Sequence, residues 1–400
     1  MSIILIGFKH VGKSSFGRAL AAHLALPFAD LDELIEAKAG HSVQALHKQD
    51  PEAFRALERE VLKENLGFEG VLALGGGTPM HNQDLLEGQV CIHLRADQNQ
   101  VWSWIQESGS QLFPNKEAFQ ESWAKRLPVY EALASLTLHN TNDYAAMLSS
   151  ITFNRILGYP LAHSWTPRLH NRIYKDLGIP VLMFAHASPQ LSLDGLKPGS
   201  LTAVTMPFKE EILPHLDALD PLAQELGAVN TVLFQDGKLK GYNTDWHGIA
   251  YALRHLNLRD KKVLLLGAGG AAKAVAEYVN QQGAQLFILN RDFEKAQHLA
   301  QKLDGQAITQ DAIPADTFLA VNATPLEAPL GEIPPQAYRF DLHYNPAQTP
   351  FLQGAQPGKA ISGLDMFVAQ ALEQVFLWSG QRLAPELYLN SEPYEASQNH

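Results

Sequence analysis

The stretch IILIGFKHVGKSS, residues 3–15, sets the architecture of the first part of the chain. Four apolar residues run directly into G-x-x-x-x-G-K-S, and a segment with helical spacing of apolar residues follows. This pattern predicts a buried strand, a loop whose backbone N–H groups cradle phosphate, and a helix. The alternative is a tight strand-to-helix turn with a solvated lysine. The strand before the loop and the helix after it favour the phosphate-binding loop.

The residues of this loop have distinct predicted roles. Lys13 reaches the β- and γ-phosphates of ATP, and the Ser14 hydroxyl is a ligand of Mg²⁺. His10 lies inside the loop, and the pattern assigns it no role. The residues predicted to bind ATP are Gly7, Gly12, Lys13, Ser14 and Ser15.

A second glycine-rich loop of a different type lies in VLLLGAGGAAKAV, residues 263–275. The order of strand, glycine-rich turn, helix and second strand is typical of a dinucleotide-binding fold. The pyrophosphate is expected at the N-terminus of the helix. The predicted contacts are Gly267, Ala268, Gly269, Gly270 and Ala271.

The length of 400 residues predicts two or three domains, and helix and strand signals alternate throughout. We predict an α/β protein in three parts. The first part, residues 1–150, contains the phosphate-binding loop, and its resemblance to a kinase family, described below, implies a P-loop kinase domain with a parallel sheet like that of nucleoside monophosphate kinases. An α/β substrate-binding domain spans 151–250 and is completed by a helix over 363–385. A Rossmann domain spans 251–362.

Composition excludes several classes of protein. The net charge of −11 is shared by both halves, and no basic stripe is present, so neither nucleic acid nor a membrane surface is an expected partner. The single cysteine, Cys91, excludes disulfides within the chain, and no apolar run reaches membrane-spanning length. The histidines lack metal-ligand spacing. We expect a cytoplasmic enzyme with small-molecule substrates, and an oligomer remains open.

Four segments after the first loop narrow its function: ADLDELIE (29–36), AFRALE (53–58), LGGG (74–77) and AKRLPVYEAL (124–133). In this order they resemble the shikimate kinase family up to about residue 150. The resemblance implies that Asp30 supports Mg²⁺ and that Asp32 holds the substrate hydroxyls and acts as a base. It further implies that the substrate carboxylate and ring are bound by Arg55, Arg126, Gly75, Gly76 and Gly77.

The turn-rich stretch ESGSQLFPNKEA, residues 107–118, is the expected lid of the kinase, and it departs from the family pattern. The family places an arginine before a proline, where it lies against the ATP phosphates, whereas here Phe113 precedes Pro114. Trp102 and Trp104 stand where the family tends to have basic residues. Because an arginine at this place contributes orders of magnitude in rate, three alternatives are open. The kinase is slow, Lys116 supplies the charge, or the domain only binds ligands.

Six motifs in the rest of the chain follow one another in the order of a second family. They are GYPLAHSWTP (158–167), TAVTMPFKEE (202–211), ELGAVNT (225–231), GYNTDWHG (241–248), the second glycine-rich loop and DMFVAQALE (365–373). Together they resemble shikimate dehydrogenase. The resemblance implies that Lys209 and Asp245 are the catalytic pair that delivers a proton to the reduced carbonyl oxygen. The alternative for such a pair alone is a structural salt bridge.

The resemblance also implies a substrate pocket. Ser164 and Thr166, with Tyr344, hold the substrate carboxylate, and Thr205, Asn230 and Gln370 contact ring hydroxyls. Two positions depart from the family: Thr166 replaces a serine, and Ala203 replaces an asparagine. The S-x-T form resembles the branch that accepts quinate, so quinate is an alternative substrate.

The cofactor is predicted from the end of the strand that follows the second loop. An arginine at this place admits the 2′-phosphate of NADP, whereas an acid binds the 2′-hydroxyl of NAD. The chain has Asn290, Arg291 and Asp292 here, with Lys295 following, and the two basic residues favour NADP. Asp292 keeps NAD as the alternative. VNATP (321–325) resembles the loop beside the nicotinamide, which adds Asn322 and Thr324.

The two resemblances imply a bifunctional enzyme of aromatic biosynthesis. It reduces 3-dehydroshikimate to shikimate with NADPH and phosphorylates shikimate with ATP and Mg²⁺. The alternative is a quinate/shikimate dehydrogenase whose kinase-like domain is a sensor that only binds ligand.

Overall fold

The computed structural model describes residues 2–109, 113–162, 164–325, 331–346 and 348–389. The chain forms two compact units, with the boundary between Thr202 and Ala203. The mixed α/β architecture with parallel sheets confirms the predicted fold class.

The first unit is built on a parallel five-stranded sheet in the order β2-β3-β1-β4-β5. The central strand β1 lies between β3 and β4, with Ile3 opposite both Val71 and Val90. Because helices cover both faces of such a sheet, β1 reads as an uninterrupted apolar run and is buried at every position. The strands are β1 (Ile3–Ile6), β2 (Phe28–Asp30), β3 (Val71–Ala73), β4 (Val90–Arg95) and β5 (Leu136–His139).

Helices alternate with these strands, and their ends follow from local sequence. Asp50 accepts hydrogen bonds from the backbone N–H groups of Glu52 and Ala53, and Pro51 occupies the first position of the helix that follows. The helices are α1 (Lys13–Leu24), α2 (Leu31–Ala39), α3 (Val43–Gln49), α4 (Pro51–Asn65), α5 (Thr78–His81), α6 (Gln83–Leu86), α7 (Gln98–Glu107), α8 (Lys116–Leu133) and α9 (Tyr144–Ser149).

The remainder of the first unit begins a second α/β pattern. β6 (Thr152–Gly158) and β7 (Val181–Ala187) pair in parallel, with Thr152 opposite Val181, and α10 (Thr166–Asp176) connects them. The boundary between the two units falls inside β8 (Leu201–Val204).

The second unit opens with short elements around a hairpin. β10 (Thr231–Gln235) and β11 (Lys238–Tyr242) pair in antiparallel through Asp236 and Gly237, both of which have positive φ, as tight hairpin turns require. The neighbouring elements are α11 (Phe208–Glu211), a 3₁₀ turn (Leu213–His215), β9 (Ala218–Leu219), α12 (Pro221–Leu226) and α13 (Asp245–Ala252).

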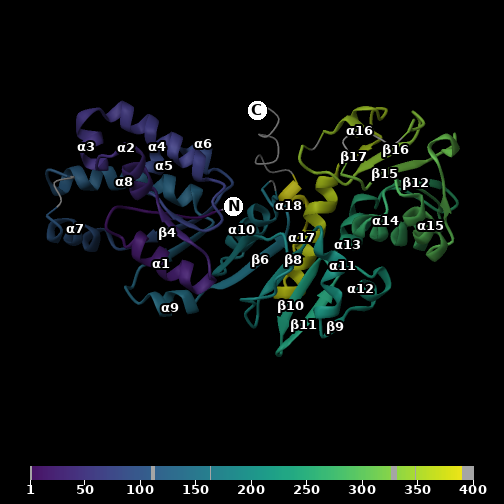
Figure 1. Ribbon diagram of the computed structural model, residues 1–400, viewed down its shortest axis with the longest axis horizontal. Coiled ribbons are helices and arrows are strands. Elements are labelled where there is room, and N and C mark those ends of the chain that lie inside the picture. Colours follow the sequence, from purple (N-terminus) through teal and green to yellow (C-terminus); the bar gives the residue numbers. More distant parts are fainter. Residues whose placement is uncertain (1, 110–112, 163, 326–330, 347, 390–400) are drawn as a thin grey trace. The chain divides into compact units, whose positions relative to one another are not determined.

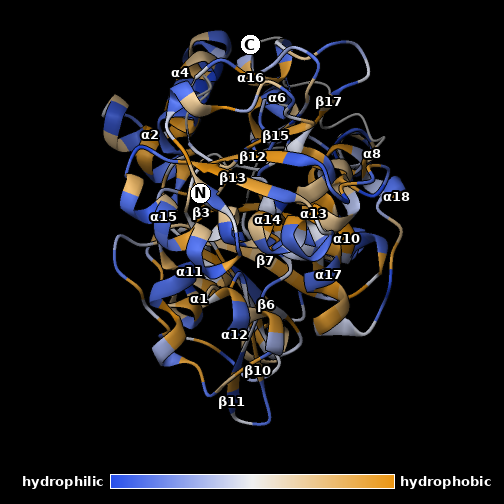
Figure 2. Ribbon diagram, turned by 90° about the vertical axis from the view of Figure 1, so that its right-hand side faces the viewer, coloured by the Kyte–Doolittle hydropathy of each residue, from blue (hydrophilic) through white to orange (hydrophobic). Residues whose placement is uncertain are grey.

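The second unit also contains a six-stranded parallel sheet in the order β14-β13-β12-β15-β16-β17. α14 (Gly270–Gln281) and α15 (Phe293–Lys302) pack on β12 and β13 in the green part of Figure 1. Figure 2 shows β12 and β13 as largely hydrophobic, as expected for buried parallel strands. The strands are β12 (Lys262–Leu266), β13 (Gln285–Leu289), β14 (Gln306–Ala307), β15 (Leu319–Asn322), β16 (Tyr338–Asp341) and β17 (Ala360–Ile361).

The C-terminal helix is shorter than the predicted 363–385. α17 runs from Gly363 to Ser379 and packs on α13. It ends because Gly380 adopts a left-handed conformation, φ 74°, and donates its N–H to Phe376 O. The other elements are a 3₁₀ turn (Gln310–Ala312), α16 (Pro350–Gln353) and α18 (Glu386–Leu389). Within the described ranges, every helix is too short or too polar to cross a membrane.

Candidate active sites

The phosphate loop joins β1 to α1. Gly7 and Gly12 have φ of 143° and 85°, conformations that favour glycine. Lys13 is buried and donates hydrogen bonds from Nζ to Gly7 O at 3.0 Å and to Phe8 O at 2.8 Å. Burial lowers the pKa of Lys13 to about 8. Ser15 is exposed in the first turn of α1.

Two residues far along the chain support this loop and were missed by the sequence motifs. Asn140 donates from Nδ2 to Val11 O at 2.8 Å, and it is buried. A Cβ on Gly12 would lie 2.9 Å from Tyr144 Oη, so the loop passes close to the start of α9. Neither residue belongs to a recognisable pattern, because its role depends on how β5 and α9 pack beside the loop.

Ser14 and Asp30 meet at the carboxyl edge of the sheet. Ser14 Oγ donates to Asp30 Oδ2 at 2.6 Å, and Asp30 Oδ1 accepts from the backbone N–H of Asp32 at 3.1 Å. Hydroxyl and carboxylate oxygens are the ligands that Mg²⁺ prefers. The pair therefore fits the predicted metal site. Within the described residues, the chain has no cluster of three or more histidine, cysteine or acidic side chains able to hold a metal ion.

The predicted substrate residues of the kinase converge on the glycine run. A Cβ on Gly75 would lie 2.9 Å from Asp32 Oδ1, and a Cβ on Gly77 would lie 3.0 Å from Arg55 Nη2. Arg126 Nη1 donates to Gly76 O at 3.3 Å. The glycines therefore let one carboxylate and two guanidinium groups approach the same stretch of backbone.

Glu58 orients this group, and the sequence did not single it out. Its carboxylate is 2% exposed, lies 2.7 Å from Arg55 Nη1 and accepts a hydrogen bond from Thr78 Oγ1 at 2.8 Å. A buried ion pair with a further hydrogen bond fixes the guanidinium. Burial, followed by the charge of Asp30, raises the pKa of Asp32, which suits a carboxylate that accepts a proton.

Aromatic side chains occupy the predicted lid. Phe113 stacks on Phe8 of the phosphate loop with ring centroids 5.9 Å apart, and it contacts Phe119 edge-on at 5.6 Å. Trp102 and Trp123 join the same cluster through Phe119. Phe113 therefore contacts the loop as a ring where the family places an arginine. Residues 110–112 of the predicted lid lie outside the described residues.

Lys116, the alternative source of positive charge, has a different partner. Its Nζ donates to Asn99 Oδ1 on α7 at 3.2 Å, at an exposed position. Lys116 begins α8 directly after the helix cap Asn115.

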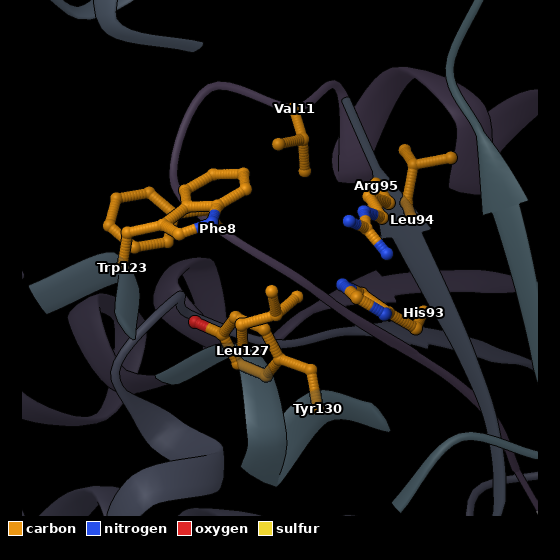
Figure 3. Close-up of a pocket in the computed structure, with 8 residues that line it drawn as sticks. All are labelled: Phe8, Val11, His93, Leu94, Arg95, Trp123, Leu127 and Tyr130. Carbon is orange, nitrogen blue, oxygen red and sulfur yellow. The ribbon is translucent and has the colours of Figure 1, made fainter. Parts of the chain in front are cut away.

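A small cavity lies beneath the phosphate loop (Figure 3). Figure 3 shows Phe8 and Trp123 on one side and His93 and Arg95 on the other. The volume of about 10 Å³ is enough for one water molecule at most. Burial lowers the pKa of His93 to about 4, so this histidine is neutral and belongs to the core.

The first unit also carries part of the predicted dehydrogenase pocket. The backbone N–H of Thr166 donates to Ser164 Oγ at 3.4 Å, which sets both side chains at the start of α10. His163, within the same motif, lies outside the described residues.

The predicted catalytic pair of the dehydrogenase forms in the second unit. Lys209 Nζ lies 2.6 Å from Asp245 Oδ2, and the two side chains are only 18% and 6% exposed. Asn230 Nδ2 donates to the other carboxylate oxygen, Oδ1, at 2.8 Å. Both oxygens of Asp245 are thus engaged, which fixes the carboxylate and the ammonium that it binds.

Asn230 is the centre of a larger buried network. Its amide group also bonds the Thr244 hydroxyl at 2.9 Å and Gln370 Oε1 at 3.3 Å. The predicted residues Lys209, Asp245, Asn230 and Gln370 are therefore brought together. The residues that complete the network and were missed by the motif roles are Thr231, Asn243, Thr244 and Gln374.

Two further predicted residues of the second unit have these contacts. Thr205 is partly buried at the end of β8, where its carbonyl accepts the N–H of Phe208. Tyr344 stacks on Phe367 of α17 with centroids 4.1 Å apart, one turn before Gln370.

The second glycine-rich loop approaches the catalytic pair. A Cβ on Gly270 would lie 3.5 Å from Lys209 Cδ, so the loop passes beside the lysine side chain. Gly267 has φ 111°, and a Cβ there would lie 2.9 Å from Ala323 O. Asn322 is buried, bonds Asp341 and accepts the Thr324 hydroxyl at 2.7 Å. The 321–325 loop is thereby fixed against the cofactor loop.

A cleft of about 950 Å³ extends from this loop along α15. Ala268 and Gly269 line one part of the cleft, and Asn290, Arg291, Asp292 and Lys295 line another. Asp292 caps α15 by accepting the backbone N–H of Lys295 at 3.3 Å, and its other oxygen lies 3.6 Å from Lys295 Nζ. Its carboxylate thus contacts its own helix, although both Asp292 and Arg291 line the cleft.

Comparisons with known proteins match both parts of the chain. The family model described as shikimate kinase matches residues 10–154. The model of the shikimate dehydrogenase substrate binding domain matches 156–232, and the model of shikimate / quinate 5-dehydrogenase matches 250–318.

Individual relatives are 31–38% identical to this chain over the matched residues. Shikimate dehydrogenase (NADP(+)) of Oleidesulfovibrio alaskensis is 38% identical over 250 residues, which cover 57% of this chain and 90% of that protein. The structure of shikimate 5-dehydrogenase from Thermus thermophilus in complex with NADP(H) and shikimate is 33% identical, with TM-score 0.54 over 59% of this chain and 96% of that one. The shikimate dehydrogenase structure from Aquifex aeolicus gives TM-score 0.55 at 31% identity, over 62% of this chain and 98% of that one.

Fold and sites together define a P-loop kinase-type domain followed by a dehydrogenase with a lysine–aspartate pair beside a dinucleotide-binding loop. The chain belongs to the shikimate dehydrogenase family and carries a shikimate kinase domain fused in front of it. This finding confirms the resemblance to both families.

Proposed function

We propose that the C-terminal part of the chain reduces 3-dehydroshikimate to shikimate with NADPH. The observation that carries this proposal is the shielded Lys209–Asp245 pair, held by Asn230 and lying beside Gly270 of the cofactor loop. The relatives named for shikimate dehydrogenase with NADP(+) support the same substrate and cofactor.

The residues of the chain supply the proton chemistry. NADPH supplies hydride when bound. In this proposal Lys209 Nζ gives a proton to the carbonyl oxygen as that oxygen becomes a hydroxyl, and Asp245, which accepts a hydrogen bond from Nζ, holds the ammonium. Asn230 fixes the carboxylate, and Gln370 joins the same hydrogen-bonded group. Preorganised groups of this kind lose little energy to reorganisation during the reaction.

NADP is the cofactor that the cleft supports best. Arg291 and Lys295 line it and can bind the 2′-phosphate, whereas Asp292 is engaged in capping α15. NAD is the alternative, and comparing turnover with both cofactors on shikimate and on quinate tests both choices. Higher kcat/KM with NAD than with NADP would overturn the cofactor proposal.

We further propose that the N-terminal domain phosphorylates shikimate with ATP and Mg²⁺. The supporting observation is the convergence of Asp32, Arg55 and Arg126 on Gly75–Gly77, next to the phosphate loop. Two guanidinium groups suit a substrate carboxylate. Ser14 and Asp30 would hold Mg²⁺, whose positive charge offsets phosphate charge.

In this reaction the chain positions groups and neutralises charge. Asp32, with its raised pKa, accepts the proton of the attacking hydroxyl, and Lys13 turns from the loop carbonyls to the phosphates. A domain that only binds ligand is not favoured, because the family model for the kinase matches residues 10–154 and its predicted residues converge.

The test is ADP release by the full chain with MgATP, with and without shikimate, beside the Lys13→Ala variant. Shikimate-dependent ADP that is lost in the variant is expected. If the dehydrogenase of the same preparation is active and ADP does not depend on shikimate, the kinase proposal is wrong.

A further inference from the structure

His10 lies inside the phosphate loop, and neither the motif nor the family resemblance gives it a role. Its φ is 67°, in the left-handed region where glycine is the residue without a steric penalty. Histidine enters this region more often than most side chains, yet at a cost. A non-glycine residue held in this conformation inside a ligand loop is a reason to look for a function of its side chain.

The imidazole reaches from the loop to the end of α7. Its Nε2 lies 3.3 Å from Ser108 Oγ, at the C-cap of that helix. Ser108 Oγ also lies 2.8 Å from Ile105 O, to which it must donate because a carbonyl has no proton to give. The single hydroxyl hydrogen is thus used, so Ser108 accepts from Nε2–H of His10. The neutral imidazole therefore carries its proton on Nε2, and Nδ1 is the nitrogen that can take up a second proton.

The surroundings of His10 are cationic. Lys9 lies beside it in the loop, Lys13 begins α1, and the α7 residue that bonds it, Ser108, is neutral. Burial first, and then these two lysines, lower the pKa of His10. An anion bound in the loop reverses the sign of that field, since phosphate charge favours the protonated imidazole.

We propose that His10 is a phosphate-contacting residue of the kinase site, which takes a proton from solvent onto Nδ1 when nucleotide binds and supplies positive charge beside the phosphates. This inference rests on the proposed kinase function. It accounts for a lid in which Phe113 stacks on Phe8: the cation that the lid lacks is supplied by the loop. The chemical class that His10 recognises is the diphosphate group of a nucleotide.

The test is calorimetric titration of the full chain with MgADP, in two buffers of different ionisation enthalpy at each of several pH values from 6 to 8. The wild-type protein is expected to take up about half a proton per nucleotide at a pH midway between the pKa values of free and nucleotide-bound His10. Its affinity should fall about tenfold from pH 6 to pH 8, which corresponds to a pKa shift of about one unit. Lys13, with a pKa of about 8, is already protonated over most of this range.

Two variants isolate the imidazole. His10→Asn keeps a residue that tolerates positive φ, and His10→Gly has no steric cost at this φ. Both should bind MgADP about tenfold more weakly at pH 6.5, the usual effect of losing one charge-assisted hydrogen bond, and should lose the proton uptake. Ser108→Ala is the matched control: it removes the hydrogen bond to Nε2 and should keep the proton uptake.

The outcomes separate this inference from the kinase proposal. If wild type and both His10 variants bind MgADP with equal proton uptake and equal pH dependence, His10 has no such role and the nucleotide site stands. If the wild-type chain, with active dehydrogenase, binds no MgADP at any pH, the kinase proposal and this inference both fail.

Discussion

At the scale of single residues, Lys13 carries a consequence for pH. Its pKa is lowered to about 8 by burial, so its ammonium is present below that pH and lost as the pH rises through it. Bound phosphate favours the charged form, so nucleotide affinity should decrease steadily above pH 8. Titrating ADP between pH 7.5 and 9.5 checks this expectation.

The matched variant for that experiment is Lys13→Arg, whose charge persists at every accessible pH. Its affinity should be weaker at pH 7.5, because the larger planar guanidinium does not fit the buried place of the Lys13 ammonium, but it should stay flat with pH. A wild-type curve equally flat to pH 9.5 would contradict the role given to burial.

Arg291 is the residue on which NADP preference should depend. Arg291→Ala should raise the KM for NADP about tenfold or more, the loss expected for a charge-assisted hydrogen bond to phosphate, and leave the KM for NAD within about twofold. Steady-state kinetics with both cofactors checks it. Asp292→Ser is the control, because serine also caps a helix and removes only the carboxylate. Equal effects of Arg291→Ala on both cofactors would mean that the arginine is structural.

At this scale the sequence predicts residues that act through a short motif better than residues that support them. Lys13, Lys209 and Asp245 stand in contiguous patterns; Lys209 and Asp245 lie together in the structure, and Lys13 bonds carbonyls of the phosphate loop. Glu58 and Thr244 lie inside the segments AFRALE and GYNTDWHG, but the motifs assign them no role. Their contacts join segments far apart in the chain, and one sequence does not reveal which distant polar groups meet.

At the scale of elements, residues at the end of β5 and the start of α9 contact and support the phosphate loop. Asn140 follows β5 and bonds Val11 O, which would otherwise be a buried carbonyl without this donor. Asn140→Ala should destabilise the loop by about 1–3 kcal/mol and weaken nucleotide binding several-fold. Thermal unfolding and ADP titration measure the two effects.

The adjacent Thr141→Ala is the matched control for that variant. Thr141 is exposed, and its hydroxyl accepts only a long hydrogen bond, 3.4 Å, from the N–H of Asp143. It should change both measurements little. Equal behaviour of the two variants would show that the Asn140 bond does not support the loop.

The elements themselves were largely predictable. The strand before each glycine-rich loop and the helix after it follow from apolar runs and periodicity, and both are present. The end of α17 was predicted too late, because apolar spacing continues into LWSG while Gly380 stops the helix through backbone conformation. The stacking of Phe113 on Phe8 could not be predicted from the sequence, because it depends on where the lid lies in the folded domain.

At the scale of the whole molecule, two sets of site residues belong to one chain and share no residue. Asp245→Asn should lower dehydrogenase kcat by about 10²–10⁴, the usual contribution of proton transfer, and leave shikimate-dependent ADP release unchanged. Lys13→Ala should do the reverse. Assaying both reactions on each purified variant makes each activity the folding control for the other. Loss of both activities in either variant would contradict their independence.

The aromatic cluster of the lid also gives the kinase domain an intrinsic tryptophan fluorescence that should respond to nucleotide binding. Trp123 lies with its ring centroid 5.2 Å from that of Phe8 in the phosphate loop, and Trp102 lies 5.3 Å from Phe119. Indole emission depends on the polarity around the ring, so filling the loop should shift the fluorescence of the intact chain without any added dye. Trp123→Phe, which keeps an aromatic ring, should remove most of that signal while nucleotide still binds.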